Sequence, residues 1–178
     1  MCKIWLFVIF VNQISKQMTK HIEMVLAVSD NKVIGLNNGL PWGKIPADMD
    51  RFRAMTLGKT VVMGRATHQS IGRLLPRRHN VVLGSRALEG AELFSDLDDV
   101  LQAYQECVVI GGSVLCNYML QRDMIDVAHI TEVHATFAGD VIFNIGLYPK
   151  MKEVSREYKA VSDDNPYPLS FVTYRRED

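Results

Sequence analysis

Residues 27–56 read AVSDNKVIGLNNGLPWGKIPADMDRFRAMT, and this stretch decides the kind of fold that the rest of the chain completes. The run 22–28, which overlaps its start, is apolar and contains β-branched side chains, and this predicts a buried strand. The asparagines, glycine and proline of 37–41 predict a long loop. Beyond Pro46 the apolar spacing changes to the helical period. The stretch therefore predicts a strand–loop–helix unit.

One acid in this unit stands where an apolar residue is expected. Asp48 falls on the same helical face as Phe52 and Met55, at the spacings i, i+4 and i+7. An acid in the first turn of a helix is commonly stabilised by the helix dipole alone. A carboxylate against an apolar wall is costly to desolvate unless hydrogen-bond donors meet it, and a flat amidine-like ligand supplies two of them in parallel. Asp48 is thus either a helix-start acid or a ligand-binding carboxylate.

Outward from this unit, strand patterns alternate with helical ones. Ser95 is a candidate N-cap for a helical stripe over 97–104, and Gly111 and Gly112 lead into a helix that continues through Leu120. The alternation predicts an α/β fold with a central mixed, mostly parallel sheet, helices on both faces and an antiparallel C-terminal strand pair. Further strands are predicted at 60–63, 80–83, 107–110, 126–133, 154–161 and 169–175.

Length and composition exclude several classes of protein. The 178 residues suffice for one domain, and 48% apolar with 22% charged residues argue against intrinsic disorder. The formal net charge is zero and the pI is near 7.0, so the chain lacks the excess of basic residues that is typical of a nucleic-acid binder. The three cysteines (Cys2, Cys107 and Cys116) form no Cys-x-x-Cys pair. His129 and His134 have no further potential metal ligands at a suitable spacing in the sequence. We therefore expect no metal, no disulfide framework and a reduced, cytoplasmic protein.

The first seventeen residues differ in composition from the remainder. Removing Lys3 and Lys16 from the 20 basic residues leaves 18 against 20 acidic residues, a net charge of −2 for the rest of the chain. The apolar run 4–11 is eight residues long, whereas a membrane-spanning helix needs roughly 20. A signal peptide is the alternative, but no small-residue cleavage site follows this run. We expect residues 1–17 to be a disordered extension or to reflect an upstream start, and residues 18–178 to form the domain.

Several motifs occur in an order that resembles the dihydrofolate reductase family. They are the stretch 27–56, VVMGRATHQSIGRLLPRRHNVVL (61–83), VVIGGSVL (108–115), HITEV (129–133) and AGDVIF (138–143). The resemblance covers about residues 22–176. It implies an NADPH-dependent enzyme that reduces 7,8-dihydrofolate to 5,6,7,8-tetrahydrofolate, by hydride transfer to the pteridine and protonation of the adjacent imine nitrogen. It also implies a monomer inhibited by antifolates, with neither nucleic acid nor membrane as a partner.

The resemblance implies a catalytic group of Asp48, Trp42 and Thr131. Asp48 would grip the amino-pyrimidine edge of the pteridine and promote its protonation, and Thr131 would hydrogen-bond the same carboxylate. Arg78 matches the arginine that holds the glutamate α-carboxylate of the substrate, a natural task for a guanidinium fork. Arg78 belongs to a cluster with Arg73 and Arg77, and the alternative is that this cluster is only a solvated basic turn. The implied substrate-binding residues are Val25, Asp48, Met49, Phe52, Ile71, Arg73, Leu75, Arg78 and Thr131.

For the cofactor, the resemblance implies NADPH at the turn 111–113, whose Gly-Gly peptide is cis in the family. A helix N-terminus there offers free backbone N–H groups to the pyrophosphate. Ser85 and Arg86 follow a strand at the place where the family recognises the extra phosphate of NADPH, and the loop 34–42 corresponds to a mobile lid. The implied cofactor-binding residues are Ala27, Ile34, Gly35, Gly64, Arg65, Ala66, Thr67, Leu83, Ser85, Arg86, Ile110, Gly111, Gly112, Ser113, Val114, Leu115 and Cys116.

Some residues depart from the family pattern, and two rival functions stay open. Cys116 stands where an aromatic residue usually lies beside the nicotinamide, and Ala66 and Val114 replace residues that are often basic. One rival is the related pyrimidine reductase of riboflavin synthesis, which needs neither Arg78 nor the Asp48 signature. The other is a non-catalytic nucleotide- or RNA-binding protein on the same fold. Dihydrofolate-dependent oxidation of NADPH separates these functions.

Overall fold

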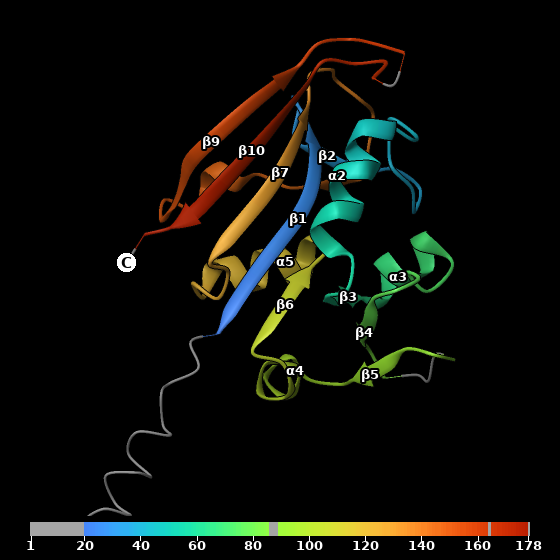
Figure 1. The fold of residues 1–178 in the computed structure, drawn as a ribbon, viewed down its shortest axis with the longest axis vertical. Coiled ribbons are helices and arrows are strands. Elements are labelled where there is room, and N and C mark those ends of the chain that lie inside the picture. The colour runs from blue at the N-terminus through green and yellow to red at the C-terminus, as the bar shows by residue number, and fades with distance from the viewer. Residues whose placement is uncertain (1–19, 86–88, 164, 178) are drawn as a thin grey trace, which may run out of the picture.

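The fold is organised around an eight-stranded sheet with the strand order β5-β4-β3-β6-β1-β7-β10-β9 (Figure 1). The computed structural model describes residues 20–85, 89–163 and 165–177. All strand pairs from β5 to β7 are parallel, while β10 is antiparallel to both β7 and β9. The strands of this sheet are β1 (His21–Ser29), β3 (Thr60–Gly64), β4 (His79–Leu83), β5 (Glu92–Phe94), β6 (Glu106–Val109), β7 (Val127–Val133), β9 (Met151–Lys159) and β10 (Leu169–Arg176).

Alternation along the strands sends side chains to two separate apolar layers. On β3, Val62 joins one cluster, whereas its neighbours Val61 and Met63 join the other. The same alternation separates Val81 from Val82 on β4. Because successive side chains of a strand point to opposite faces, near-continuous apolar strands require cover on both sides.

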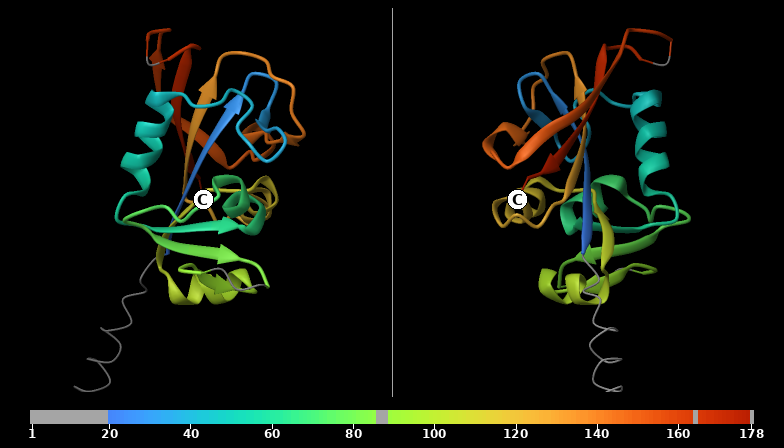
Figure 2. Two further views of the ribbon diagram at one scale, coloured as in Figure 1. Left: turned by 90° about the vertical axis from the view of Figure 1, so that its right-hand side faces the viewer. Right: turned by 60° about the vertical axis from the view of Figure 1, so that its left-hand side comes forward.

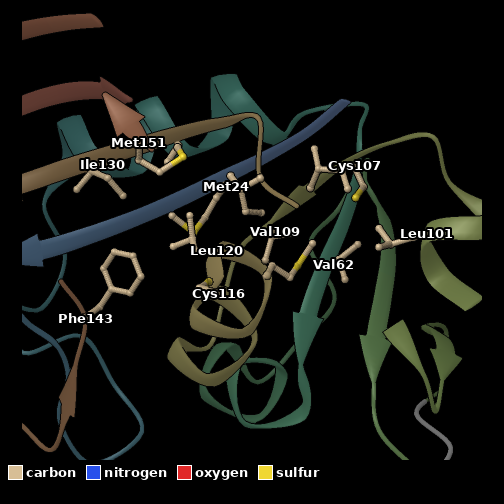
Figure 3. Packing of buried hydrophobic residues seen from close by; sticks show 14 of the residues in the cluster. Met24, Val62, Leu101, Cys107, Val109, Cys116, Leu120, Ile130, Phe143 and Met151 are labelled. Atoms are coloured by element: carbon tan, nitrogen blue, oxygen red, sulfur yellow. The ribbon is translucent and has the colours of Figure 1, made fainter. Parts of the chain in front are cut away.

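Helices supply that cover on both faces. Figure 2 shows α2 on one side of the sheet and α5 on the other, in both of its views. The first layer packs under α4 and α5, and Figure 3 shows Cys116 and Leu120 of α5 directed toward Met24 and Val109 of the sheet. The predicted fold class is confirmed. The helices are α2 (Pro46–Thr56), α3 (Arg65–Ile71), α4 (Leu97–Ala103), α5 (Ser113–Gln121) and the short 3-10 helix η1 (Ile145–Leu147).

Two local features differ from the sequence prediction. The N-cap of α4 is Asp96, whose side chain accepts a hydrogen bond from the Asp98 N–H at 2.7 Å, so the expected Ser95 cap was wrong by one residue. A second, two-stranded sheet pairs β2 (Val33–Gly35) with β8 (Val141–Ile142). The start of the predicted loop 34–42 is therefore a strand, held by β8.

The remaining expectations concern the chain ends and the membrane. Residues 1–17 lie outside the described residues. Within 20–85, 89–163 and 165–177, no helix is both long enough and apolar enough to cross a bilayer.

We predict that Gly139→Ala lowers the stability of the protein by disturbing the packing of β2 against the segment that leads into β8. A Cβ at residue 139 would lie 2.0 Å from Val33 Cγ1 and 2.6 Å from the Gly35 carbonyl oxygen. Overpacking of this kind costs about 1–3 kcal/mol, which urea unfolding measures. Gly39→Ala is the matched control because its Cβ would lie 3.5 Å from the Leu36 carbonyl oxygen. Equal unfolding free energies for the two variants would contradict this packing.

Candidate active site

The acid that the sequence singled out is buried against the sheet. Helix α2 begins after Ile45, which is fully buried, and Pro46 occupies its first turn. This start directs Asp48 toward β7, and Asp48 and Thr131 retain only 6% and 2% exposure. Burial raises the pKa of Asp48 above its ordinary value, and this effect outweighs a side-chain hydrogen bond from Thr131 and the positive charge of Arg51. The structure thus brings together the two predicted polar partners.

Arg51 is a member of this site that the sequence reasoning missed. Its Nη1 donates to Thr131 Oγ1 at 3.1 Å, and its Nη2 donates to the Val172 carbonyl oxygen at 3.4 Å. Its guanidinium carbon lies 4.7 Å from the centre of the Phe171 ring. The available signal was the i, i+3 spacing from Asp48, which places both residues on one side of the helix.

Trp42 lies beside the same region, in a cluster with Ile45, Val133 and Leu169. Its ring meets the Phe137 ring edge-on, with the centroids 5.6 Å apart. The indole is 7% exposed, and its Nε1–H is buried without an acceptor among the described residues. A buried indole N–H ordinarily has a hydrogen-bond acceptor, so this donor is available to a bound molecule.

The predicted apolar wall assembles on the α2 side of the sheet. Phe52, Ile71 and Leu75 all pack against the cluster that contains Val25 and Ile110. They come from α2, from α3 with the loop that follows it, from β1 and from the residue after β6, so four separate segments of the chain contribute to one apolar surface. Met49 is half-buried on α2 beside Asp48.

At the other end of α2, Arg78 is fixed by helix and loop groups. Its Nε and Nη2 donate to Thr56 Oγ1 at 3.2 and 3.1 Å, and its Nη1 donates to the Pro76 carbonyl oxygen at 2.8 Å. Burial and the positive charges of Arg53 and Arg77 hold the pKa of Arg78 below its ordinary value. Like charges gathered in this way favour an anion. Arg73, in contrast, is exposed in the loop after α3.

A second group of predicted residues meets where β3 and β6 end. The Gly64 N–H donates to the Gly111 carbonyl oxygen at 2.8 Å, and the Gly111–Gly112 peptide is cis. A Cβ on either glycine would lie 3.2–3.3 Å from Thr67 Oγ1, and Gly111 has a φ of 122°. Glycine is therefore needed for this backbone to approach the Thr67 hydroxyl, and the first N–H groups of α5 follow directly.

The next strand end continues this group. The Arg65 side chain lies against Gly84, where an added Cβ would be 3.6 Å from Arg65 Cβ. Leu83 ends β4, Ser85 is exposed after it, and Arg86 lies outside the described residues.

The other predicted cofactor residues lie along α5, α3, β1 and β2. On α5, Ser113 and Leu115 are half-buried, while Val114 is 83% exposed. Cys116 is fully buried in the core, and burial raises its thiol pKa to about 12. Ala66 is exposed on α3, and Ala27, Ile34 and Gly35 are half-buried.

The side chains that could bind a metal ion are those of His, Cys, Asp and Glu. No group of three or more His, Cys, Asp or Glu side chains suited to a metal ion occurs in the part of the chain that the structure describes.

Comparison with known proteins identifies the family. The sequence model described as dihydrofolate reductase matches residues 21–176. The chain belongs to the dihydrofolate reductase family. It is accordingly an oxidoreductase, and the reaction of its family is the NADPH-dependent reduction of dihydrofolate.

Individual dihydrofolate reductases agree with this assignment. Dihydrofolate reductase type 3 of Salmonella typhimurium is 38% identical over 162 residues, covering 88% of this chain and 98% of its own. The Bacillus subtilis enzyme is 36% identical over 163 residues, covering 88% and 95%. The structure of dihydrofolate reductase from Enterococcus faecalis, complexed with NADP(H) and RAB-propyl, matches with a TM-score of 0.83 and 30% identity, over 90% of this chain and 98% of its own.

We predict that Asp48→Asn stabilises the folded protein at pH 7. Because burial raises the folded-state pKa of Asp48, its favourable contribution exists below the ordinary aspartate pKa and is lost as pH rises through the folded-state value. The neutral amide removes this cost, so the unfolding free energy should rise by about 0.5–2 kcal/mol at pH 7. The gain should shrink in acid, where Asp48 is protonated.

Urea unfolding at both pH values measures this effect. Asp50→Asn is the matched control, because Asp50 lies on the same helix, pairs with Arg53 at the surface and is 70% exposed. Its unfolding free energy should stay within about 0.5 kcal/mol of the parent. A loss of stability in Asp48→Asn at pH 7 would contradict the burial argument.

Proposed function

We propose that Asp48 and Thr131 form the proton-promoting centre of the NADPH-dependent reduction of 7,8-dihydrofolate to 5,6,7,8-tetrahydrofolate. The observation that supports this proposal is a carboxylate 6% exposed, on an otherwise apolar wall, whose pKa burial raises. A carboxyl with a raised pKa lies closer than an ordinary aspartate to the range that suits proton transfer in an enzyme. The flat amino-pyrimidine edge of the pteridine supplies the two parallel donors that such a carboxylate lacks.

In this mechanism Asp48 orients the pteridine and favours a proton at the imine nitrogen that is reduced. Thr131 hydrogen-bonds the carboxylate from β7, and this contact fixes the direction in which the carboxylate oxygens meet the ligand. The Trp42 Nε1–H, buried without a protein acceptor, provides a further donor toward the bound ring. Ile45 and Pro46 fix the start of α2, and so fix Asp48 without a side-chain cap.

The length of α2 suits the rest of the substrate. Asp48, Phe52 and Thr56 recur every four residues on one face, so they span about 12 Å along the axis. Phe52 lies between them with Ile71 and Leu75, which suits the aromatic benzoyl ring. Arg78, held by Thr56, lies at the far end and suits the glutamate α-carboxylate.

The second group of residues fits NADPH. The glycines at 111 and 112 leave a backbone cradle that a Cβ would fill, and the N-terminus of the nine-residue α5 follows it with free N–H groups. Thr67 lies at this cradle, Arg65 lies against Gly84 at the next strand end, and both suit the phosphates. When bound, NADPH supplies the hydride. Ser85 and Arg86 are the proposed partners of its extra phosphate, so NADPH should be preferred over NADH.

The proposal also covers the localisation of the protein, its oligomeric state and the inhibitors that it binds. The thiols of Cys107 and Cys116 are unpaired and buried, which supports a reduced, cytoplasmic protein. The oligomeric state that we propose is a monomer. The Enterococcus faecalis relative was solved with RAB-propyl as well as NADP(H), which supports the proposal that this chain also binds antifolate inhibitors.

We predict that Asp48→Asn lowers turnover at pH 7 by about 10²–10⁴-fold, because the amide cannot hold the proton. Activity should recover in part in acid, where solution supplies the proton directly. Dihydrofolate-dependent NADPH oxidation, followed at 340 nm in stopped flow, measures both effects. Asp50→Asn should retain parental turnover, and unchanged turnover of Asp48→Asn at pH 7 would sink the proposed role.

We predict that Arg78→Ala raises the KM for dihydrofolate by about 10–100-fold with little change in kcat, since it removes a charge-assisted contact remote from the reacting atoms. An analogue of dihydrofolate that lacks the glutamate group provides the control substrate. Its KM should be nearly equal for parent and variant. A similar rise in KM for both substrates would indicate that Arg78 only maintains the loop through Thr56.

A further inference from the structure

Arg51 is a half-buried arginine one helical turn after Asp48 on α2, and neither its residue type nor its position was expected from the motifs. We infer that Arg51 is a positioning residue: it orients the Thr131 hydroxyl toward Asp48 and sets the pH range over which the carboxylate works. This inference rests on the proposed function of Asp48. Its basis is the set of contacts that Arg51 makes with the two strands β7 and β10, together with its charge one helical turn from Asp48.

Hydrogen-bond chemistry fixes the direction of the contact. A guanidinium donates and never accepts, so Thr131 Oγ1 accepts the 3.1 Å hydrogen bond from Arg51 Nη1. The single hydroxyl proton of Thr131 is then left for another acceptor. Asp48 is that acceptor, because its carboxylate shares a side-chain hydrogen bond with Thr131. The three side chains therefore form a chain of donors that ends on the carboxylate.

The sheet register holds Arg51 in place. Thr131 on β7 pairs with Phe171 on β10, which pairs with Glu157 on β9, so the three residues form one row across the sheet. Arg51 lies over this row, with its guanidinium 4.7 Å from the Phe171 ring centre and a 3.4 Å contact to the Val172 carbonyl oxygen. An arginine stacked on an aromatic ring and anchored at its fork is held more firmly than a solvated one.

Charged and titratable groups from several elements surround this arginine. Asp48 and Glu157 both raise the pKa of Arg51, against a larger lowering by burial. On the other side, His129 contacts Glu23 at 3.1 Å, and burial holds the His129 pKa below its ordinary value. The charged and titratable groups around the site are Asp48 on α2, Glu157 on β9, His129 on β7, Glu23 on β1 and Lys59 after α2.

Of these groups, Asp48 is the acid whose pKa burial raises, so we assign the high-pH limb of the profile to it. His129 is already neutral there because its pKa is lowered. For Glu23, burial alone would raise the pKa, but the hydrogen bonds and charges of Lys59 and His129 hold it below the ordinary value, so Glu23 stays ionised. Loss of Arg51 removes a positive charge near Asp48 and frees the Thr131 hydroxyl, and both changes favour the protonated carboxyl.

The test is the pH profile of single-turnover hydride transfer in Arg51→Met. Because Asp48 then keeps its proton to higher pH, the midpoint of the high-pH limb should move upward by roughly half a pH unit or more. Arg51→Lys restores the charge and should return the midpoint to that of the parent. Arg51→Gln, which keeps a donor without charge, should also move upward and serves if the methionine variant does not fold.

Arg122→Met is the matched control, because Arg122 is stacked 3.7 Å above the Tyr118 ring and lies at the end of α5. Both methionine variants lose a charge and a stacking contact, so a shared fall in Tm is expected. Of these variants, only Arg51→Met and Arg51→Gln should move the pH midpoint. An unmoved midpoint in Arg51→Met and Arg51→Gln would overturn the inference. A parent without a high-pH limb, or a limb that persists in Asp48→Asn, would instead overturn the proposed function.

Discussion

The site depends on one constraint: the carboxylate of Asp48 is almost completely shielded from water between α2 and the sheet. Asp48 cannot be buried at low cost by itself, because desolvation of an ionised group is expensive. Its surroundings reduce this cost only in part, through the Thr131 hydroxyl and the charge of Arg51, and its pKa remains raised. An acid that is incompletely compensated by the protein is available to a ligand that completes the compensation.

The sheet topology makes this constraint possible. Parallel pairing of β1 with β7 sets Ala27 opposite Thr131, and the antiparallel β10 then brings Phe171 to the other side of Thr131. The contacts of the arginine come from β10 and the hydroxyl from β7, which are antiparallel neighbours in this sheet. The parallel part, β3, β4 and β6, ends in the glycine-containing turns to which we assign the cofactor. Ligand sites outside the carboxyl ends of parallel strands are the general rule for α/β sheets.

The sequence predicted those features that are encoded locally. The alternating apolar strands, the helix after Pro46 and the acid on the apolar stripe each depend on residues a few positions apart. The β2–β8 pair was missed because strands of two or three residues are too short to show a period. The cap of α4 was misplaced because Ser95 and Asp96 are both good capping residues. Arg51 was missed because its partners, Phe171 and Val172, lie about 120 residues away and meet it only through the register of β10.

The pKa of Asp48 itself tests the central claim most directly. Carbon-13 NMR of the protein with labelled aspartate carboxyls resolves the titration of each residue, and the signal absent from Asp48→Asn identifies Asp48. The account predicts that this carboxyl titrates above the ordinary range of aspartate and that Arg51→Met raises its pKa further. A carboxyl that titrates at or below the ordinary aspartate value would show that its partners outweigh burial, and would contradict the account.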